Sequence, residues 1–251
     1  MKTLIKFILG ISTVLFFIFC LSSGPVQKQI TDIFQQNTLS DEEFNVEEFF
    51  EGTSEVSETN EEVEGTQDTE VIVQKYHSPE VIKYFNEITL GSEFGEGLKN
   101  PYRWTTDVKI FVQGRKPEYL MNELNDVVSE LNSIINTINI KIVSNPKDAN
   151  LFLFLGSRSQ FLSAHSNISN LPDCLGFFLT YHNESTTFVD LDRTEGQYDF
   201  QRHILREEIT QSLGLFNDSK KYDNSIFYDG YNDVTEYSEI DREIIDMLYN
   251  E

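Results

Sequence analysis

Hydrophobic and polar positions recur with regular periods along the second two-thirds of the chain. Between residues 117 and 138 the apolar residues return every three or four positions, which predicts a long amphipathic helix. Residues 107–112 alternate apolar and polar side chains, as in a strand. Ser78 and Pro79 form a helix start, because serine is a good N-cap and proline suits the first helical position. Residues 80–89 then keep helical spacing.

The remaining apolar runs predict the rest of a folded domain. Four further strands are expected, at residues 140–143, 150–155, 176–181 and 187–191. Two further helices are expected, at residues 199–213 and 237–249, with a loop-like stretch from 217 to 235 between them. One strand, one helix, several strands and then helices predict a mixed α/β or α+β domain.

The first residues are organised like a targeting segment. Lys2 and Lys6 precede an almost wholly apolar run from residue 7 to 21, and small residues follow it. This pattern predicts a secretory signal peptide at residues 1–22, with an uncleaved signal anchor as the alternative. We therefore expect an exported protein that is periplasmic, extracellular or anchored at the outer face of the cytoplasmic membrane.

Charge separates this segment from the domain. The chain has a formal net charge of -23, and residues 41–70 hold more than half of it without any Lys or Arg. Low hydrophobicity combined with charge of one sign predicts a disordered acidic linker at residues 23–75, followed by a domain at residues 76–251. The acidic excess argues against nucleic acid as a partner, and it limits membrane contact to the N-terminal segment.

The two cysteines and the single tryptophan add further expectations. The only cysteines are Cys20 and Cys174, and removal of a signal peptide leaves just the second. The sequence therefore predicts no disulfide framework and a small, buried Cys174. The single tryptophan, Trp104, is expected to anchor the core near the start of the main sheet.

The candidate chemistry lies on the helix predicted at residues 199–213. His203, Glu207 and Gln211 are spaced four apart, so they form one polar stripe, with Glu208 beside it. Two interpretations of the stripe remain open: a solvated helix face, or a polar cleft with hydrogen-bonded side chains.

The end of this helix adds a third polar group. Gly214 permits a sharp turn, which is expected to bring Asn217 back towards the helix face. The adjacent carboxyl groups of Glu207 and Glu208 are also candidates for mutual pKa shifts, and a raised pKa suits a general acid or base.

This arrangement resembles the zinc site of metzincin metallopeptidases. There, two histidines four apart on a helix and a third after a glycine turn bind zinc, and a glutamate beside the first histidine is the general base. The resemblance places the three metal-ligand positions on Glu207, Gln211 and Asn217. It places the general base on Glu208 and the turn glycine on Gly214. The base and the glycine match, whereas all three ligand positions depart from histidine.

The resemblance continues beyond the helix. Residues 224–228 lie where metzincins have the Met-turn, with Phe227 in place of the methionine. Residues 237–249 resemble the closing helix of the matrixin branch. The implied fold is α+β, a metzincin- or matrixin-like zincin domain. It has a mixed sheet, a long helix, an active-site-type helix and a C-terminal helix.

More closely, the chain resembles a bacterial family known as domain of unknown function 2927. The resemblance covers residues 76–251. The matching segments are residues 84–88, 102–104, 207–218 and 225–227.

The substituted ligands decide what the site is expected to do. One carboxylate and two amide oxygens suit calcium, magnesium or manganese better than zinc, and His203 adds one nitrogen from outside the inherited triad. Occupancy by zinc or by another divalent cation is left open. We expect a non-proteolytic binding domain at the cell envelope, with a peptide or an envelope protein as its partner. The alternative is an atypical metal-dependent peptidase or hydrolase that uses Glu208 as general base.

Overall fold

The computed structural model describes residues 77–90, 100–166, 168, 171 and 173–250. The predicted signal segment and acidic linker lie outside the described residues. Within the described residues, no helix is long and apolar enough to span a bilayer.

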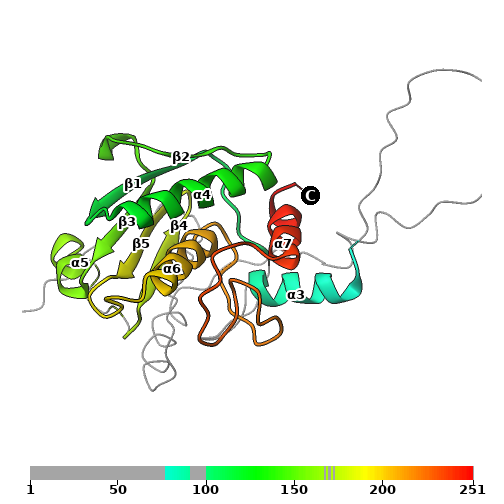
Figure 1. Cartoon of the computed structure of the whole chain (residues 1–251). Helices are drawn as coiled ribbons and strands as arrows, with labels where there is room; N and C mark the ends of the chain where they lie inside the picture. The colour runs from blue at the N-terminus through cyan, green and yellow to red at the C-terminus, as the bar shows by residue number, and fades with distance from the viewer. Residues whose placement is uncertain (1–76, 91–99, 167, 169–170, 172, 251) are drawn as a thin grey trace, which may run out of the picture.

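A single mixed sheet has the strand order β2-β1-β3-β5-β4 (Figure 1). Its strands are β1 (Val108–Gly114), β2 (Ile140–Ile142), β3 (Leu151–Gly156), β4 (Gly176–Tyr181) and β5 (Glu184–Asp190). The first four strands of this order are parallel, and β4 is antiparallel to β5. The carboxyl ends of β1, β3 and β5 therefore meet at one edge of the sheet.

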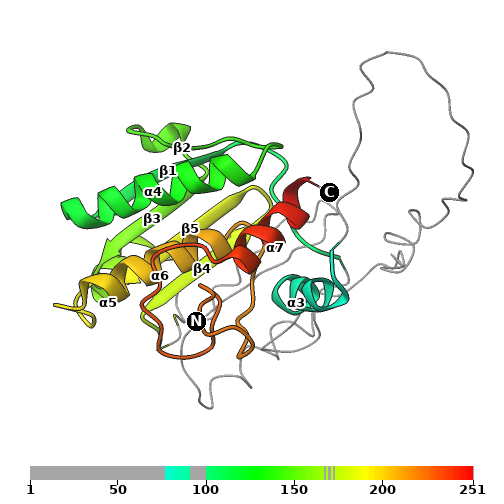
Figure 2. The same ribbon diagram turned by 45° about the vertical axis from the view of Figure 1, so that its right-hand side comes forward.

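Helices surround this sheet. They are α3 (Pro79–Leu90), α4 (Glu118–Ile134), the short α5 (Arg158–Ala164), α6 (Tyr198–Gln211) and α7 (Glu239–Asn250), with a 3-10 turn at Pro146–Asp148. Helices α4 and α6 lie side by side over one face of the sheet, and α3 lies near α7 (Figures 1 and 2). The molecule is an α+β domain with a mixed sheet, as the sequence predicts.

Alternation along the strands divides the apolar interior in two. In β3, Leu151, Leu153 and Leu155 join the main core, to which α4 and α6 also contribute. Phe154 points to the other face because successive strand side chains alternate. It packs there against Phe161 of α5, with ring centroids 5.6 Å apart.

Several local predictions are confirmed. The Ser78 hydroxyl accepts a hydrogen bond from the Val81 amide at the start of α3. Trp104 is 1% exposed, and its indole N–H donates to the Ser212 carbonyl at 2.9 Å. Cys174 is fully buried.

Two element boundaries differ from the sequence prediction by three or more residues, and one helix was not predicted. Helix α4 ends at Ile134 rather than at 138, because the Asn132 side chain bonds both backbone polar groups of Ile140 and starts β2 there. Strand β5 begins at Glu184 rather than at 187, because a two-residue hairpin turn with His182 at φ 50° joins it directly to β4. Helix α5 was not predicted, although its Ser157–Gln160 capping box is a recognisable start signal.

Candidate functional site

From His203 onwards, helix α6 is buried around its whole circumference, although its sequence is strongly polar. Every residue from His203 to Gln211 is buried, with α4 on one side and β4 and β5 beneath. Glu207 and Gln211 are each 1% exposed. The interpretation of the polar stripe as a solvated face is therefore wrong, and its side chains must find their partners inside the protein.

His203 and Glu207 face each other at the first turn of the stripe. The His203 Nδ1 lies 2.9 Å from the Val234 carbonyl oxygen, and a carbonyl can only accept, so Nδ1 carries the proton. Burial lowers the pKa of His203, which favours the neutral ring. Its Nε2 then offers a lone pair 3.6 Å from Glu207 Oε2, which is too long for a hydrogen bond.

Glu208 projects towards Gly176 of β4. It is 3% exposed, and its Oε2 has no hydrogen-bond partner among the described residues. Burial, followed by the charges of Glu207, Cys174 and Asp218, raises the pKa of Glu208 well above its ordinary value. The carboxyl therefore favours its protonated, neutral form.

Gly176, the first residue of β4, makes room for this carboxyl. A Cβ atom at Gly176 would lie 2.1 Å from Glu208 Oε1 and 2.6 Å from the Ile204 Cγ2. Sequence reasoning missed Gly176 as a site residue. The available signal was a glycine at the start of a predicted strand, since a strand glycine often marks a close approach of another group.

Gln211 and Asn217, to which the metzincin resemblance assigns the second and third ligand positions, are both hydrogen-bond donors. Gln211 Nε2 donates to Asp218 Oδ1 at 2.6 Å. Asn217 donates both its backbone N–H and its side-chain Nδ2 to the Ile88 carbonyl, at 3.1 and 2.9 Å. These bonds hold the turn and attach it to α3.

The glycine turn lies where the sequence places it. Gly214 follows α6 with φ +125°, a backbone conformation that side-chain-bearing residues rarely adopt. A Cβ atom there would lie 2.1 Å from the Tyr102 carbonyl oxygen. Backbone conformation and lack of space therefore both require glycine at this position.

Phe227 is fully buried, and the turn that contains it is anchored to α7. Its amide donates to Ser225 Oγ at 3.0 Å, and that hydroxyl donates to Asp241 Oδ1 at 2.5 Å. The Ile226 amide reaches Asp241 Oδ2 at 3.2 Å. Burial raises the pKa of Asp241, while these donors favour its charged form. The turn at Phe227 is thus a fixed structural element.

The donor set does not fit zinc. A catalytic zinc site needs three protein ligands, drawn from histidine, cysteine and carboxylates. Among the described residues, no three such side chains group together as metal ligands would. His203 and Glu207 form only a pair, and the amide groups of Gln211 and Asn217 donate to protein acceptors.

The topology and this helix–turn arrangement define an α+β domain with a buried, carboxyl-bearing helix at its centre. The family model described as "Protein of unknown function (DUF2927)" matches residues 78–251. The match spans well over half of the chain, and the chain belongs to this family. No curated protein matches the chain.

Two solved structures of myroilysin are similar to the chain. One, with a TM-score of 0.40, covers 60% of this chain and 86% of the myroilysin chain at 12% identity. The other, with a TM-score of 0.38, covers 59% and 82% at the same identity. The fold assignment rests on the elements and the strand order described above.

Proposed function

We propose that this protein is a non-hydrolytic binding domain built on a metzincin-like plan, and that it acts outside the cytoplasmic membrane at the cell envelope. The observation that carries the proposal is the use of the former ligand positions. Gln211 and Asn217 donate hydrogen bonds that hold the turn after α6 and its contact with α3. Hydrogen bonds of this kind stabilise the fold, and they support a structural role for these two side chains.

Glu208 supports the same conclusion. Burial favours the neutral carboxyl of Glu208, which must lose its proton before it can act as a general base. The neutral group is a hydrogen-bond donor instead. The alternative of an atypical hydrolase with Glu208 as base therefore has less support than binding.

The partner we expect is an extended peptide or a segment of an envelope protein. Strand β4 is the last strand in the sheet order, and its first residue, Gly176, lies against Glu208. Extended peptides commonly bind by adding to a sheet beside such a strand. The N-terminal apolar segment motivates the proposed location.

Metal content is the first test. The purified chain, prepared without chelators or a histidine tag, should contain no stoichiometric metal by mass spectrometry, and a chelator should leave its unfolding transition unchanged. Stoichiometric metal that disappears in Glu207→Ala would overturn the proposal and favour the hydrolase.

Partner binding is the second test. A partner recovered from envelope extract should remain bound in the presence of a chelator and to the Glu208→Gln variant. Loss of binding on chelation would count against a metal-independent binding domain. Peptide hydrolysis by the wild type that Glu208→Gln abolishes would also contradict it.

A further inference from the structure

Helix α5 covers a second apolar cluster, on the face of the sheet opposite α4 and α6. Phe161 is the buried side chain of α5, and Phe154, Phe177 and Phe188 of the neighbouring strands pack with it. We call these four residues the phenylalanine cluster. The ring centroids of Phe161 and Phe188 lie 4.7 Å apart. Because α5 has seven residues and one buried side chain, few groups hold it on the sheet.

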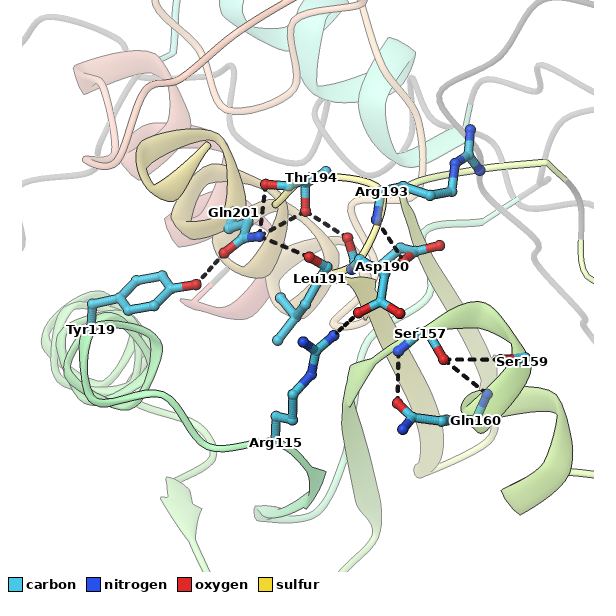
Figure 3. Close-up of polar contacts among 11 residues, drawn as sticks. Arg115, Tyr119, Ser157, Ser159, Gln160, Asp190, Leu191, Arg193, Thr194 and Gln201 are labelled. Atoms are coloured by element: carbon cyan, nitrogen blue, oxygen red, sulfur yellow. Dashed lines mark hydrogen bonds and ion pairs between the residues drawn. The ribbon is translucent and has the colours of Figure 1, made fainter. Parts of the chain in front are cut away.

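The first turn of α5 is held by groups that do not titrate near neutral pH. The Ser157 hydroxyl accepts from the Gln160 amide at 3.2 Å, and Gln160 Oε1 accepts from the Ser157 amide at 3.0 Å (Figure 3). Arg158 donates to the Leu171 carbonyl. Hydroxyl, amide and guanidinium groups keep one protonation state between about pH 5 and 8, so this end of the helix stays attached over that range.

His165 holds the other end of α5. Its backbone N–H donates to the Phe161 carbonyl at 2.9 Å, and its ring stacks on the Phe161 ring with centroids 4.8 Å apart. Its Nε2 lies 3.0 Å from Gln113 Oε1 of β1, and its ring meets that of Phe154 of β3 at 6.1 Å. A single imidazole therefore joins the end of α5 to two strands.

The surroundings of His165 supply no counter-charge. The side chains of the described residues that contact its ring are an amide and two phenyl rings, all neutral. The charged residues of the three elements around it are Lys109 of β1 and Arg158 of α5, and both are cations. Burial lowers the pKa of His165. The neutral ring is therefore the form that the closed arrangement of α5 favours.

We propose that His165 is a pH-sensitive switch, whose protonation releases the end of α5 from the sheet and uncovers the phenylalanine cluster. The neutral ring stacks on Phe161 and bonds Gln113, whereas an imidazolium in the same place would be a partly buried charge without an anion. Because His165 is only half-buried, the charged ring gains by turning out to water, which removes both contacts. The attachment is complete above the ordinary histidine pKa of about 6.5 and weakens as the pH falls below it. This proposal is independent of the function assigned to α6.

Hydrogen exchange of the full chain, followed by mass spectrometry, tests the proposal. Exchange at residues 161–165 is measured at about pH 5 and about pH 7.5, corrected for the intrinsic rate at each pH. Division by the exchange of α4 removes changes in global stability. We expect the resulting ratio to be about three- to tenfold larger at pH 5, because one pKa unit corresponds to a factor of ten. An NMR titration should place the midpoint of His165 below about 6.5.

Three variants make the test specific. His165→Phe keeps a ring beside Phe161 that takes up no proton, so the ratio should become independent of pH. Gln113→Glu gives the imidazolium an anionic partner, so the ratio at pH 5 should equal or fall below that at pH 7.5. The control Ser163→Glu adds the same charge on the exposed side of α5 and should leave the wild-type pH dependence unchanged within about twofold.

Three outcomes would overturn the proposal. The first is an equal ratio at the two pH values in the wild-type chain. The second is a wild-type pH dependence in His165→Phe, which would place the titrating group elsewhere. The third is a wild-type pH dependence in Gln113→Glu, which would show that charge on His165 does not control α5. The third outcome decides the question even if His165→Phe fails to fold.

Discussion

Helix α6 has buried charged residues on two sides, and the two sides differ in whether these residues have partners of opposite charge. On the side of α4, Arg206 is 1% exposed and bonds Glu123 at 2.8 Å and Glu130 at 3.0 Å through Nη2. Its guanidinium carbon also lies 4.7 Å from the centre of the Tyr237 ring. On the side of β4, the Oε2 of Glu208 has no such partner among the described residues.

The difference separates a buried charge that is compensated within the fold from a buried carboxyl that is not. Charges of opposite sign around Arg206 compensate one another, so removal of one partner would leave an uncompensated buried charge between α4 and α6. The isolated carboxyl of Glu208 is held by its surroundings in a form that costs free energy to ionise. Proteins keep such groups mainly where a site requires, or once required, them.

The largest expected effect on stability comes from removing Arg206, the buried cation between α4 and α6. Arg206→Met leaves Glu123 and Glu130 facing each other without their cation, and burial already raises the pKa of Glu123. We expect the free energy of unfolding to fall by about 3–5 kcal/mol, measured by denaturant titration. The control Arg202→Met, whose partner Asp199 is largely exposed, should cost less than about 0.5 kcal/mol. Similar losses in the two variants would show that the Arg206 cluster has no special role.

The turn that ends α6 also contributes to stability, through Gly214. Gly214→Ala places a side chain at φ +125° and 2.1 Å from the Tyr102 carbonyl, so we expect a loss of about 3 kcal/mol or more. The control Gly196→Ala has φ +81° and open space around its Cβ, and it should cost about 1 kcal/mol. Thermal or chemical unfolding measures both. Equal losses would mean that only the backbone conformation matters at Gly214.

Much of this fold could be predicted from local sequence patterns, because its long elements bury one face. The apolar period of α4 and the alternation of β1 are such patterns. The turn at Gly214 was also predicted, since glycine there has a local reason. Helix α5 was missed because it has only seven residues, too few to show a period.

The site was harder to predict because its partners come from distant parts of the chain. Arg206 bonds Glu123, which lies 83 residues earlier in the sequence, and neither segment alone predicts the pair. Gly176 meets Glu208 only because β4 and α6 pack together. The burial of a polar helix such as α6 follows from compensation by other elements, which a helical period does not reveal.

Replacing Glu208 tests whether its buried carboxyl, which lacks a partner of opposite charge, lowers stability when it ionises. Because its folded-state pKa is raised, Glu208 favours folding below the ordinary glutamate pKa of about 4.3, and that contribution is lost as the pH rises towards the folded-state value. Glu208→Gln, which needs no proton, should therefore raise the free energy of unfolding at pH 8 by more than about 1 kcal/mol, since each pKa unit is worth about 1.4 kcal/mol. It should also flatten the decline of stability between pH 5 and 8.

Unfolding titrations at several pH values measure this effect, with the exposed Glu184→Gln as the control. A lower stability of Glu208→Gln at pH 8 would show that the ionised carboxyl is stabilised in the fold. That result would return Glu208 to the role of a general base.

The smallest expected effect is that of replacing Asp190. It tests whether the buried Asp190 carboxylate lacks compensation, as Glu208 does, or is compensated within the protein, as Arg206 is. Asp190→Asn keeps the acceptor for the amides of Asp192 and Arg193 and replaces a charged oxygen that has no donor among the described residues. We expect the free energy of unfolding to stay unchanged or to rise by up to about 1 kcal/mol. A loss above about 2 kcal/mol would mean that the carboxylate is compensated within the protein, as Arg206 is. Unchanged or increased stability would instead mean that the Asp190 carboxylate is not compensated within the fold, as in the case of Glu208.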